Sequence, residues 1–320
     1  MKARNEEAKR VLVTGGAGFI GSHIVDKLVE LGHSVAVVDD LSAGRKGYVN
    51  KQAHFYQMDI CSPQLSEVFK TERPQIVNHH AAQIQVQRSV REPILDAQTN
   101  ILGSLNVLEN ARKYGVEKVV FPSSGGTIYG EPEYLPCDEG HPIRPLSPYA
   151  AAKYAVETYI QLYRVTYGLS YTILRYSSVY GPRQDPYGEA GVIAIFAQAM
   201  LDGRVPTING SGEQERDFLY IDDVVEANLM VMSGGEGQIL NIGTGRGTSV
   251  NSIFQQLKDI IRYSKEAVHG PPKPGEVFRI CLGISKAQCD LGWLPRVSLQ
   301  EGLQRTVDHF RSLSSTAGNQ

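Results

Sequence analysis

The chain has 320 residues, 42% of them hydrophobic, and a formal net charge of −2. This length allows a large buried core, organised either as one big domain or as two interleaved lobes. The near balance of 32 basic and 34 acidic residues argues against nucleic acid or a membrane surface as a partner, because neither polyanion would meet a strongly positive field.

The four cysteines show neither zinc-ligand spacing nor a disulfide framework, so we expect reduced thiols and no metal site. The adjacent His79 and His80 lack a cysteine or acidic partner at ligand spacing, and we expect them to have a packed or hydrogen-bonded role. Residues 1–10 are charged, and no apolar stretch of about 18 residues occurs. These features favour a cytoplasmic protein.

Strand-like apolar runs alternate with helical patterns through the first half of the chain. The runs lie at residues 11–14, 34–38, 54–57, 75–79, 118–122 and 171–175. This alternation predicts βαβ units and therefore an α/β fold with a parallel sheet. Two of the helices between the strands are predicted to be long, at residues 96–114 and 148–167, and Ser147 and Pro148 are a typical N-cap and first helical residue for the second.

After Gly181 the pattern changes to shorter elements separated by glycine and proline. We therefore expect a main domain over residues 1–180 and a smaller, interleaved α/β lobe over residues 181–320. The division is not clean in sequence, because the strand-like run at 238–242 suggests that residues 216–245 return to the main sheet.

A glycine-rich segment follows the first predicted strand. Gly15, Gly18 and Gly21 lie between that strand and a helix, and Asp39 follows 18 residues after Gly21, at the end of the second strand. Glycines let a pyrophosphate approach the helix N-terminus, and the carboxylate accepts hydrogen bonds from the adenosine ribose hydroxyls. Three glycines alone are also typical of a tight turn, but the flanking strand, helix and acid predict a dinucleotide site, with NAD favoured because Asp39 repels a 2′-phosphate.

Tyr149 and Lys153 are four residues apart in the second long helix and therefore share one of its faces. A phenol ordinarily has a pKa of about 10, and an ammonium group beside it, together with a positive nicotinamide ring, favours the phenolate. The pair then serves as a general base near neutral pH. In isolation, the same spacing is more often a solvent-facing tyrosine and lysine on an amphipathic helix.

Several motifs, taken in order, carry a resemblance to a known family. They are the glycine-rich segment at 14–21, Met58–Ile60, His80–Ala82, Ser123 and Ser124 before Tyr129 and Gly130, the Tyr149 and Lys153 pair, and the segment at 175–181. Together they resemble the extended short-chain dehydrogenase/reductase family, and more narrowly its NAD-dependent nucleotide-sugar epimerases of the UDP-glucose 4-epimerase type, over residues 10–310.

This resemblance implies a Rossmann-type doubly wound sheet, a homodimer through the long helices, and a set of site residues. The implied NAD-binding residues are Gly15, Gly18, Phe19, Ile20, Gly21, Asp39, Asp40, Asp59, Ile60, Ala81, Ala82, Asn100, Ser123, Tyr149, Lys153, Tyr176 and Val179. The implied substrate-binding residues are Ser178, Val192, Arg216, Lys273 and Glu276. Val192 is expected to begin a helix that meets the substrate diphosphate, which Arg216 also grips.

The resemblance also implies a reaction. Tyr149 takes the proton of the sugar 4-hydroxyl while NAD accepts a hydride from carbon 4, which gives a 4-keto sugar. This sugar then turns over in the pocket, the hydride returns to the opposite face of carbon 4, and Tyr149 returns the proton. The best-matching substrate pair is UDP-glucose and UDP-galactose. UDP-glucuronate and UDP-N-acetylhexosamines stay open as alternatives, as do a nucleotide-sugar reductase and a non-catalytic NAD sensor.

The chain departs from the family pattern at several positions. Gly125 stands where the family usually has a catalytic Ser or Thr, so the hydrogen-bond donor to the reacting oxygen must be Ser124, Thr127 or a water, and we favour Ser124. Gly126 and Thr127 replace the acids that family dehydratases and decarboxylases use. Ser178 replaces an Asn, Lys273 replaces an Arg with its bidentate fork, and Ile280 leaves the size of the sugar pocket open.

Arg183 has two possible roles in sequence. It either meets a carboxylate on the sugar or anchors the loop in which it lies.

Overall fold

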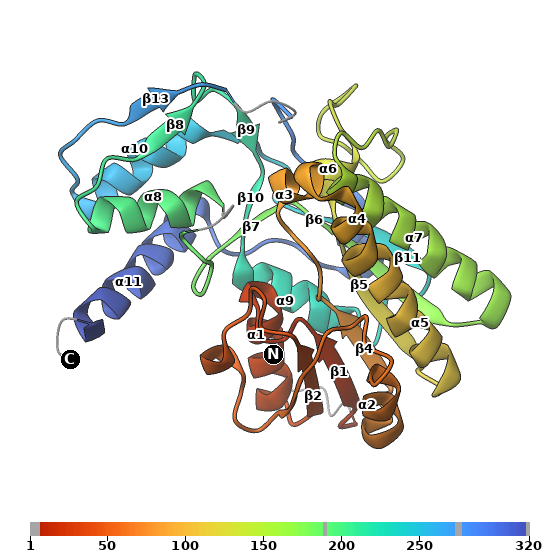
Figure 1. The fold of residues 1–320 in the computed structure, drawn as a ribbon. Coiled ribbons are helices and arrows are strands. Elements are labelled where there is room, and N and C mark those ends of the chain that lie inside the picture. The colour runs from red at the N-terminus through yellow and green to blue at the C-terminus, as the bar shows by residue number, and fades with distance from the viewer. Residues whose placement is uncertain (1–6, 188–190, 273–276, 318–320) are drawn as a thin grey trace.

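The structure is a computed structural model that describes residues 7–187, 191–272 and 277–317. Two lobes are visible in Figure 1: a sheet covered by helices on both faces, and a smaller lobe of helices and short strands beside the carboxyl ends of the sheet. None of the described helices is long and apolar enough to cross a membrane.

A seven-stranded, all-parallel sheet forms the larger lobe, as predicted. Its strand order is β11-β6-β5-β4-β1-β2-β3. The strands are β1 (Arg10–Thr14), β2 (Ser34–Asp39), β3 (His54–Gln57), β4 (Ile76–His79), β5 (Lys118–Ser124), β6 (Ser170–Tyr176) and β11 (Gln238–Ile242). Strand order reverses between β1 and β4, and the crevice at the carboxyl ends of these strands is where doubly wound sheets bind ligands. The α/β Rossmann-type fold predicted from sequence is confirmed.

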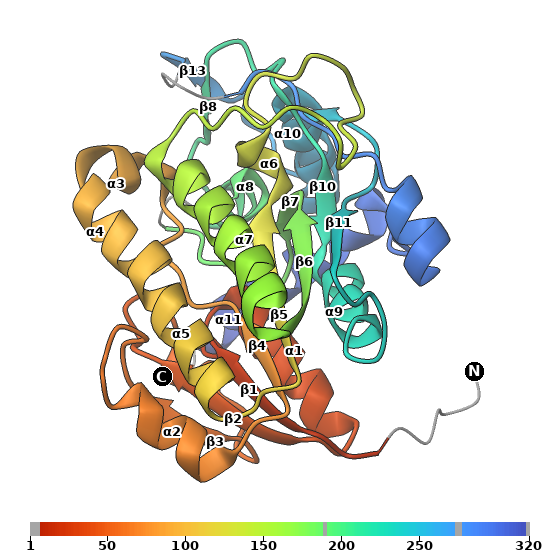
Figure 2. The ribbon, with the colours of Figure 1, turned by 90° about the vertical axis from the view of Figure 1, so that its right-hand side faces the viewer.

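Apolar side chains alternate between the two faces of this sheet and build a core on each. On one face Val11, Val13 and Val37 pack with α1 (Phe19–Glu30) and α9 (Ile221–Met230). The other face packs against α2 (Leu65–Glu72), α5 (Gly103–Lys113) and α7 (Pro148–Tyr167). Figure 2 shows this second layer, with α5 and α7 side by side in front of the sheet.

The helix predicted at 148–167 is confirmed with its N-cap. The Ser147 hydroxyl accepts a hydrogen bond from the Ala150 amide, Pro148 is the first helical residue, and Gly168 ends α7 in the left-handed conformation at φ 73°. These local signals fix where Tyr149 stands, because α7 begins directly before it.

The long helix predicted over residues 96–114 is confirmed in its extent, but one of its turns is π-helical. A short helix, α3 (Val86–Arg91), precedes this region, which then runs through α4 (Pro93–Ala97), a π-helical turn η2 (Gln98–Leu102) and α5. At the wider turn the Asn100 side chain donates to the Gln83 carbonyl at 2.9 Å and to Asp96 Oδ1 at 2.9 Å. Such turns interrupt α-helices where local contacts compete with the regular ladder, frequently at functional sites.

The smaller lobe combines three helices with short paired strands. Its helices are α8 (Val192–Leu201), α10 (Val250–Ile261) and α11 (Leu299–Ala317), which pack together. The short strands are β7 (Ser178–Tyr180), β8 (Thr207–Asn209), β9 (Glu215–Arg216), β10 (Phe218–Tyr220), β12 (Thr248–Ser249) and β13 (Val268–Gly270). Three short helical elements of the chain complete the description: η1 (Lys46–Tyr48), α6 (Gly125–Ile128) and η3 (Ala287–Leu291). One continuous apolar cluster joins α8, α10 and α11 to β10, α9 and the sheet, so the lobes share a core.

Candidate active site

The turn after β1 is built from glycines that leave no space for side chains. Gly15 has φ 70°, and a Cβ atom there would lie 2.6 Å from the Ala81 amide nitrogen. A Cβ on Gly21 would collide with the Gly15 carbonyl oxygen, and one on Gly18 would lie 3.2 Å from the same oxygen. The three glycines therefore let β1, the turn and α1 pack directly on the chain that follows β4.

This turn and its surroundings fit NAD. Gly18 is the N-cap of α1 and offers no capping side chain, so the first-turn amides at Phe19 and Ile20 are open to an anion. Asp39 is buried, and its two oxygens accept from the amides of Ala17 at 3.0 Å and Leu41 at 2.8 Å. A carboxylate accepts about four hydrogen bonds, so acceptor sites remain for ribose hydroxyls.

Two other acidic residues of the predicted NAD set lie in exposed turns nearby. Asp40 Oδ1 accepts from the Ser42 amide, and Asp59 Oδ1 accepts from the Cys61 amide at 2.8 Å. Ile60 is buried beneath Gly103, where a Cβ would meet the Ile60 side chain at 2.7 Å. A pocket of about 310 Å³ lies here, lined by Asp59, Cys61, Leu95, Gln98, Thr99 and Leu102.

Lys153 is buried below Tyr149 on α7. Its Nζ donates to the Pro122 carbonyl at 3.1 Å and lies 4.8 Å from the centroid of the Phe121 ring and 6.0 Å from that of Tyr149. Burial lowers the pKa of Lys153 to about 8, although Asp96 and Glu157 each act to raise it. Lys153 therefore presents an ammonium group to the phenol at neutral pH.

Ser124 ends β5, and its side chain lies close enough to the Tyr149 hydroxyl to lower the pKa of that phenol. Burial raises the pKa of Tyr149 to about 12; Ser124 acts in the opposite direction, and the charge of Asp96 raises the pKa further. Thr127, the other hydroxyl considered from sequence, instead directs its Oγ1 to the Ser124 carbonyl at 3.5 Å. The structure thus brings Ser124, Tyr149 and Lys153 together.

Leu282 occupies the space beside Gly125. A Cβ on Gly125 would lie 2.6 Å from Leu282 Cδ1 and 3.3 Å from the Arg175 carbonyl oxygen. Gly125 starts α6, where its backbone conformation is open to any residue, so packing and not backbone strain excludes a side chain. A serine at 125 and a leucine at 282 compete for the same volume.

We expect Gly125→Ser to lower the free energy of unfolding by about 1–3 kcal/mol, because Leu282 is fully buried and must shift. Leu282→Ala alone is expected to cost about 2–5 kcal/mol through its cavity. The double variant should be no less stable than Leu282→Ala, since the new hydroxymethyl group enters that cavity. Urea unfolding of the four proteins measures this coupling, and strictly additive costs would contradict the packing conflict.

A buried polar network behind Tyr149 was missed from sequence. Glu157, one turn after Lys153, is fully buried, and its Oε2 accepts from Arg175 Nη2 of β6 at 2.6 Å. Arg175 also donates to the Tyr129 hydroxyl at 3.0 Å, which in turn donates to Asn241 Oδ1 at 2.7 Å. The network ties α7 to the sheet. The sequence signal that could have indicated this network is Glu157, because a residue four positions after Lys153 shares its helix face.

The rest of the predicted nicotinamide side lies around the ends of β4 and β6. Tyr176 is buried and accepts from Asn228 Nδ2 at 2.6 Å, and the Ala81 amide donates to Thr14 Oγ1 at 3.1 Å. Ala82 follows in the same segment, and Val179 lies in β7, partly exposed. The Ser123 hydroxyl, in β5, is buried without a hydrogen-bond partner, which suits a site that receives a polar ligand.

The two adjacent histidines have packed and hydrogen-bonded positions. His79 lies between Thr14 Oγ1 at 2.7 Å and Ser104 Oγ at 2.9 Å, and the His80 ring stacks on Tyr176. Burial lowers the pKa of each ring to about 3, so both are neutral. Within the described residues, no group of three His, Cys, Asp or Glu side chains is arranged to hold a metal ion.

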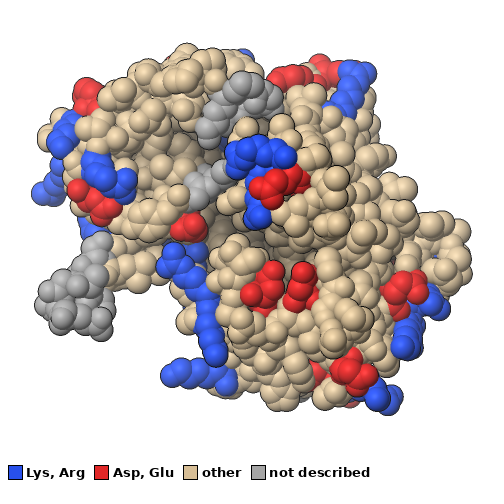
Figure 3. Space-filling view, viewed as in Figure 1, with Lys and Arg blue, Asp and Glu red and all other residues tan. Residues whose placement is uncertain are grey.

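Three of the predicted substrate residues lie on described elements. Val192 is the first residue of α8, Ser178 begins β7, and Arg216 Nη1 donates to the Glu215 carbonyl at 2.9 Å. Lys273 and Glu276 lie outside the described residues. Figure 3 shows a face hollowed between the lobes, on which basic and acidic side chains are interspersed and not separated by sign.

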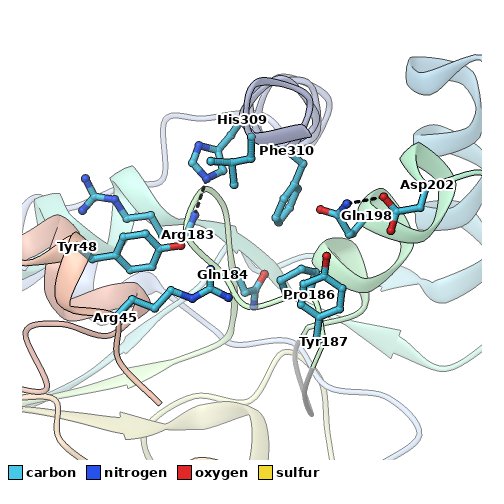
Figure 4. A pocket seen from close by; sticks show the side chains of 11 residues that line it. Arg45, Tyr48, Arg183, Gln184, Pro186, Tyr187, Gln198, Asp202, His309 and Phe310 are labelled. Atoms are coloured by element: carbon cyan, nitrogen blue, oxygen red, sulfur yellow. Dashed lines mark hydrogen bonds between the residues drawn. The ribbon is translucent and has the colours of Figure 1, made fainter. Parts of the chain in front are cut away.

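Arg183 anchors its loop, the second of the two roles considered from sequence. Its Nη2 pairs with Asp26 Oδ2 of α1 at 2.7 Å, and its amide donates to His309 Nε2 of α11 at 3.2 Å. Figure 4 shows Arg183 beside Tyr48 at one side of a pocket of about 500 Å³, with α8 on the other side. Its Nη1 is buried with no hydrogen-bond partner among the described residues.

A Rossmann-type sheet with a glycine turn and a Tyr149–Lys153 pair is typical of NAD-dependent enzymes, and comparisons with known proteins identify the family. Residues 11–243 match the model of the NAD dependent epimerase/dehydratase family. The chain belongs to this family, and the resemblance inferred from sequence is confirmed. It is an enzyme with NAD as its cofactor.

Its relatives cover nearly the whole chain. A putative UDP-glucose 4-epimerase of Methanocaldococcus jannaschii is 51% identical over 306 residues, which is 96% of this chain and 100% of that one. The crystal structure of a UDP-glucose 4-epimerase of Thermotoga maritima with UDP-glucose has a TM-score of 0.94 and 53% identity, covering 95% of this chain and 99% of that one. A Thermus thermophilus UDP-glucose 4-epimerase in complex with NAD has a TM-score of 0.91 and 46% identity, covering 94% and 99%.

Proposed function

We propose that this chain is a UDP-sugar 4-epimerase that interconverts UDP-glucose and UDP-galactose. The observation that carries the proposal is the cluster of Ser124, Tyr149 and Lys153, which joins a phenol, a hydroxyl and a buried ammonium at the carboxyl end of β5. The names of the two relatives at 51% and 53% identity support the same reaction and substrate.

NAD is proposed to lie across the carboxyl ends of β1, β2 and β4. Gly15, Gly18 and Gly21 with the first turn of α1 would hold its pyrophosphate, and Asp39 its adenosine ribose. When bound, NAD supplies the hydride acceptor and donor for carbon 4 of the sugar. Asp59 and Ile60 are proposed for the adenine side, and Asn100, Tyr176 and Val179 for the nicotinamide side.

Tyr149 is proposed to take the proton of the sugar 4-hydroxyl and to return it after the 4-keto sugar has turned over. A phenol with a pKa near 12 is a poor base at neutral pH, so positive charge beside it is needed. The Lys153 ammonium supplies this charge from the chain itself. The Ser124 hydroxyl, which lies beside Tyr149, would hold the reacting oxygen.

The same surroundings favour epimerisation over elimination within a family that includes dehydratases. Elimination needs an acid beside the sugar, and the positions that provide it in family dehydratases are Gly126 and Thr127 in this chain. Thr127 directs its hydroxyl to a backbone carbonyl. Carbon 4 is therefore the atom at which this site works.

The UDP part of the substrate is proposed to bind the smaller lobe. We assign residues 1–180, with 216–245 returning to the main sheet, to NAD, and residues 181–320 to the UDP-sugar. The amides at the start of α8, at Val192, are suited to a diphosphate, with Arg216 supplying charge. Ser178, Lys273 and Glu276 complete the proposed substrate set.

The test is incubation of the purified protein with UDP-glucose, UDP-N-acetylglucosamine and UDP-glucuronate separately, with no added cofactor, followed by NMR of the sugar. We expect the 4-epimer of UDP-glucose to form. Conversion of only one of the other two sugars would reassign the substrate. Stoichiometric consumption of NADH with a keto-sugar would indicate a reductase, and NAD binding without turnover would indicate a sensor.

We further propose a cytoplasmic homodimer. Large apolar side chains are exposed on α4 and α7, among them Ile94 at 75%, Val165 at 85% and Leu162 at 52%. An exposed apolar surface of this kind marks an interface with a partner. The four cysteines are free thiols, which suits a reducing compartment. Sedimentation should give about twice the chain mass of 35.2 kDa, and a monomer at all concentrations would contradict the dimer.

A further inference from the structure

Asp96 is a buried carboxylate for which no role was predicted. Only 1% of its surface is exposed, and it lies in α4, which packs against α7 beside the catalytic helix face (Figure 2). Its Oδ1 accepts from Gln83 Nε2 at 2.9 Å and from Asn100 Nδ2 at 2.9 Å, while its Oδ2 is buried with no hydrogen-bond partner. A buried carboxylate is costly unless positive charge compensates it.

Lys153 acts on Asp96 through its charge, which lowers the pKa of Asp96, whereas burial raises that pKa. Within the described residues the two side chains form no direct ion pair, because Lys153 Nζ donates to the Pro122 carbonyl. Two carboxylates interact electrostatically with Lys153, namely Asp96 and Glu157. Glu157 is already bonded to Arg175 through both of its oxygens, with an exposed side-chain fraction of 0% for Glu157 and 3% for Arg175. The charge of Glu157 is therefore balanced by Arg175, which leaves Asp96 to balance Lys153.

We propose that Asp96 is a positioning residue of this site, with one oxygen fixing Gln83 and Asn100 and with a negative charge that keeps the buried Lys153 protonated beside Tyr149. This inference rests on the proposed role of the Tyr149 and Lys153 pair. It adds a second requirement, since α4 and η2 must be in place for the base on α7 to work.

Charged and titratable groups from several elements surround the pair. They are Asp96 of α4, Tyr149 and Glu157 of α7, Arg175 of β6 and the neutral His79 and His80 at the end of β4. Removing the negative charge of Asp96 lowers the pKa of Lys153 and also that of Tyr149, because a carboxylate opposes ionisation of the phenol. In a bell-shaped profile of kcat against pH, the limb set by ionisation of Tyr149 and the limb set by loss of the Lys153 proton should then both move to lower pH.

The variant that separates charge from structure is Asp96→Asn, because its side-chain carbonyl can still accept from Gln83 and Asn100. We expect both limbs of its kcat profile to lie about one pH unit or more below those of the parent. Asp96→Glu, which keeps the charge, should restore the limbs even if kcat is lower. Glu92→Gln is the matched control on the neighbouring exposed turn and should leave the profile in place. A lower but unshifted profile for Asp96→Asn would overturn the proposal.

Two measurements do not depend on turnover. Ultraviolet titration of each protein against its Tyr149→Phe counterpart follows the phenolate of Tyr149, which should form at lower pH in Asp96→Asn. Carbon NMR of labelled aspartate in the parent protein should show Asp96 ionised at pH 7, whereas a protonated Asp96 would overturn the proposal even if no variant folds. If the parent epimerises no UDP-sugar, the proposed function fails, and these two readouts still decide the role of Asp96.

Discussion

Tyr149→Phe is expected to lower kcat for 4-epimerisation by about 10²- to 10⁴-fold, the usual contribution of a positioned general base. The substitution removes only the hydroxyl that Ser124 contacts and beside which Lys153 is buried. The ring stays on α7, so the helix start and the buried ammonium keep their packing. Initial rates with UDP-glucose, followed by NMR of the sugar, measure the effect.

NAD content is the control for this variant, because the glycine turn and Asp39 lie on other elements and should bind as before. Tyr154→Phe makes the same chemical change at the next residue after Lys153, where the side chain is 38% exposed, and should leave kcat unchanged. Normal turnover in Tyr149→Phe would remove this residue from the mechanism. Equal losses in both variants would point to disruption of α7 instead.

Glu157→Gln is expected to lower the free energy of unfolding by about 3–5 kcal/mol. The change keeps the shape of the side chain but leaves the Arg175 guanidinium, itself 3% exposed, without a counter-charge. Arginine does not shed its proton at any pH that proteins tolerate, so the buried charge persists. Urea unfolding of the purified protein gives the difference.

The matched control is Glu30→Gln at the end of α1. Glu30 pairs with Lys27 at 2.8 Å, but the two side chains are 67% and 40% exposed, and such surface pairs contribute at most about 1 kcal/mol. A loss below 1 kcal/mol for Glu157→Gln as well would show that α7 does not depend on the buried pair.

Features that rest on local sequence were predictable. The alternation of strand-like runs with helical patterns predicted the parallel sheet, and Ser147 and Pro148 marked the start of α7 because a cap acts over one turn. Gly15 has a positive φ, which glycine adopts at no steric cost, so its position in the turn after β1 could also be predicted.

Features that depend on contacts between distant segments were not predictable. Leu282 fills the space beside Gly125, and no local pattern connects these positions. Asn100, in the π-helical turn at η2, contacts Gln83 and Asp96, whereas helical periodicity alone predicted a long helix without this turn. The proposed contacts of the site residues with NAD and the UDP-sugar stay predictions.

Conversion of UDP-glucose by the purified protein without added NAD tests the central claim most directly. We expect UDP-galactose to accumulate to equilibrium, with NAD retained in the protein and no net NADH formed, because the hydride removed from the sugar is returned to it. A stoichiometric redox product, or no conversion of any UDP-sugar by the NAD-bound protein, would contradict the account.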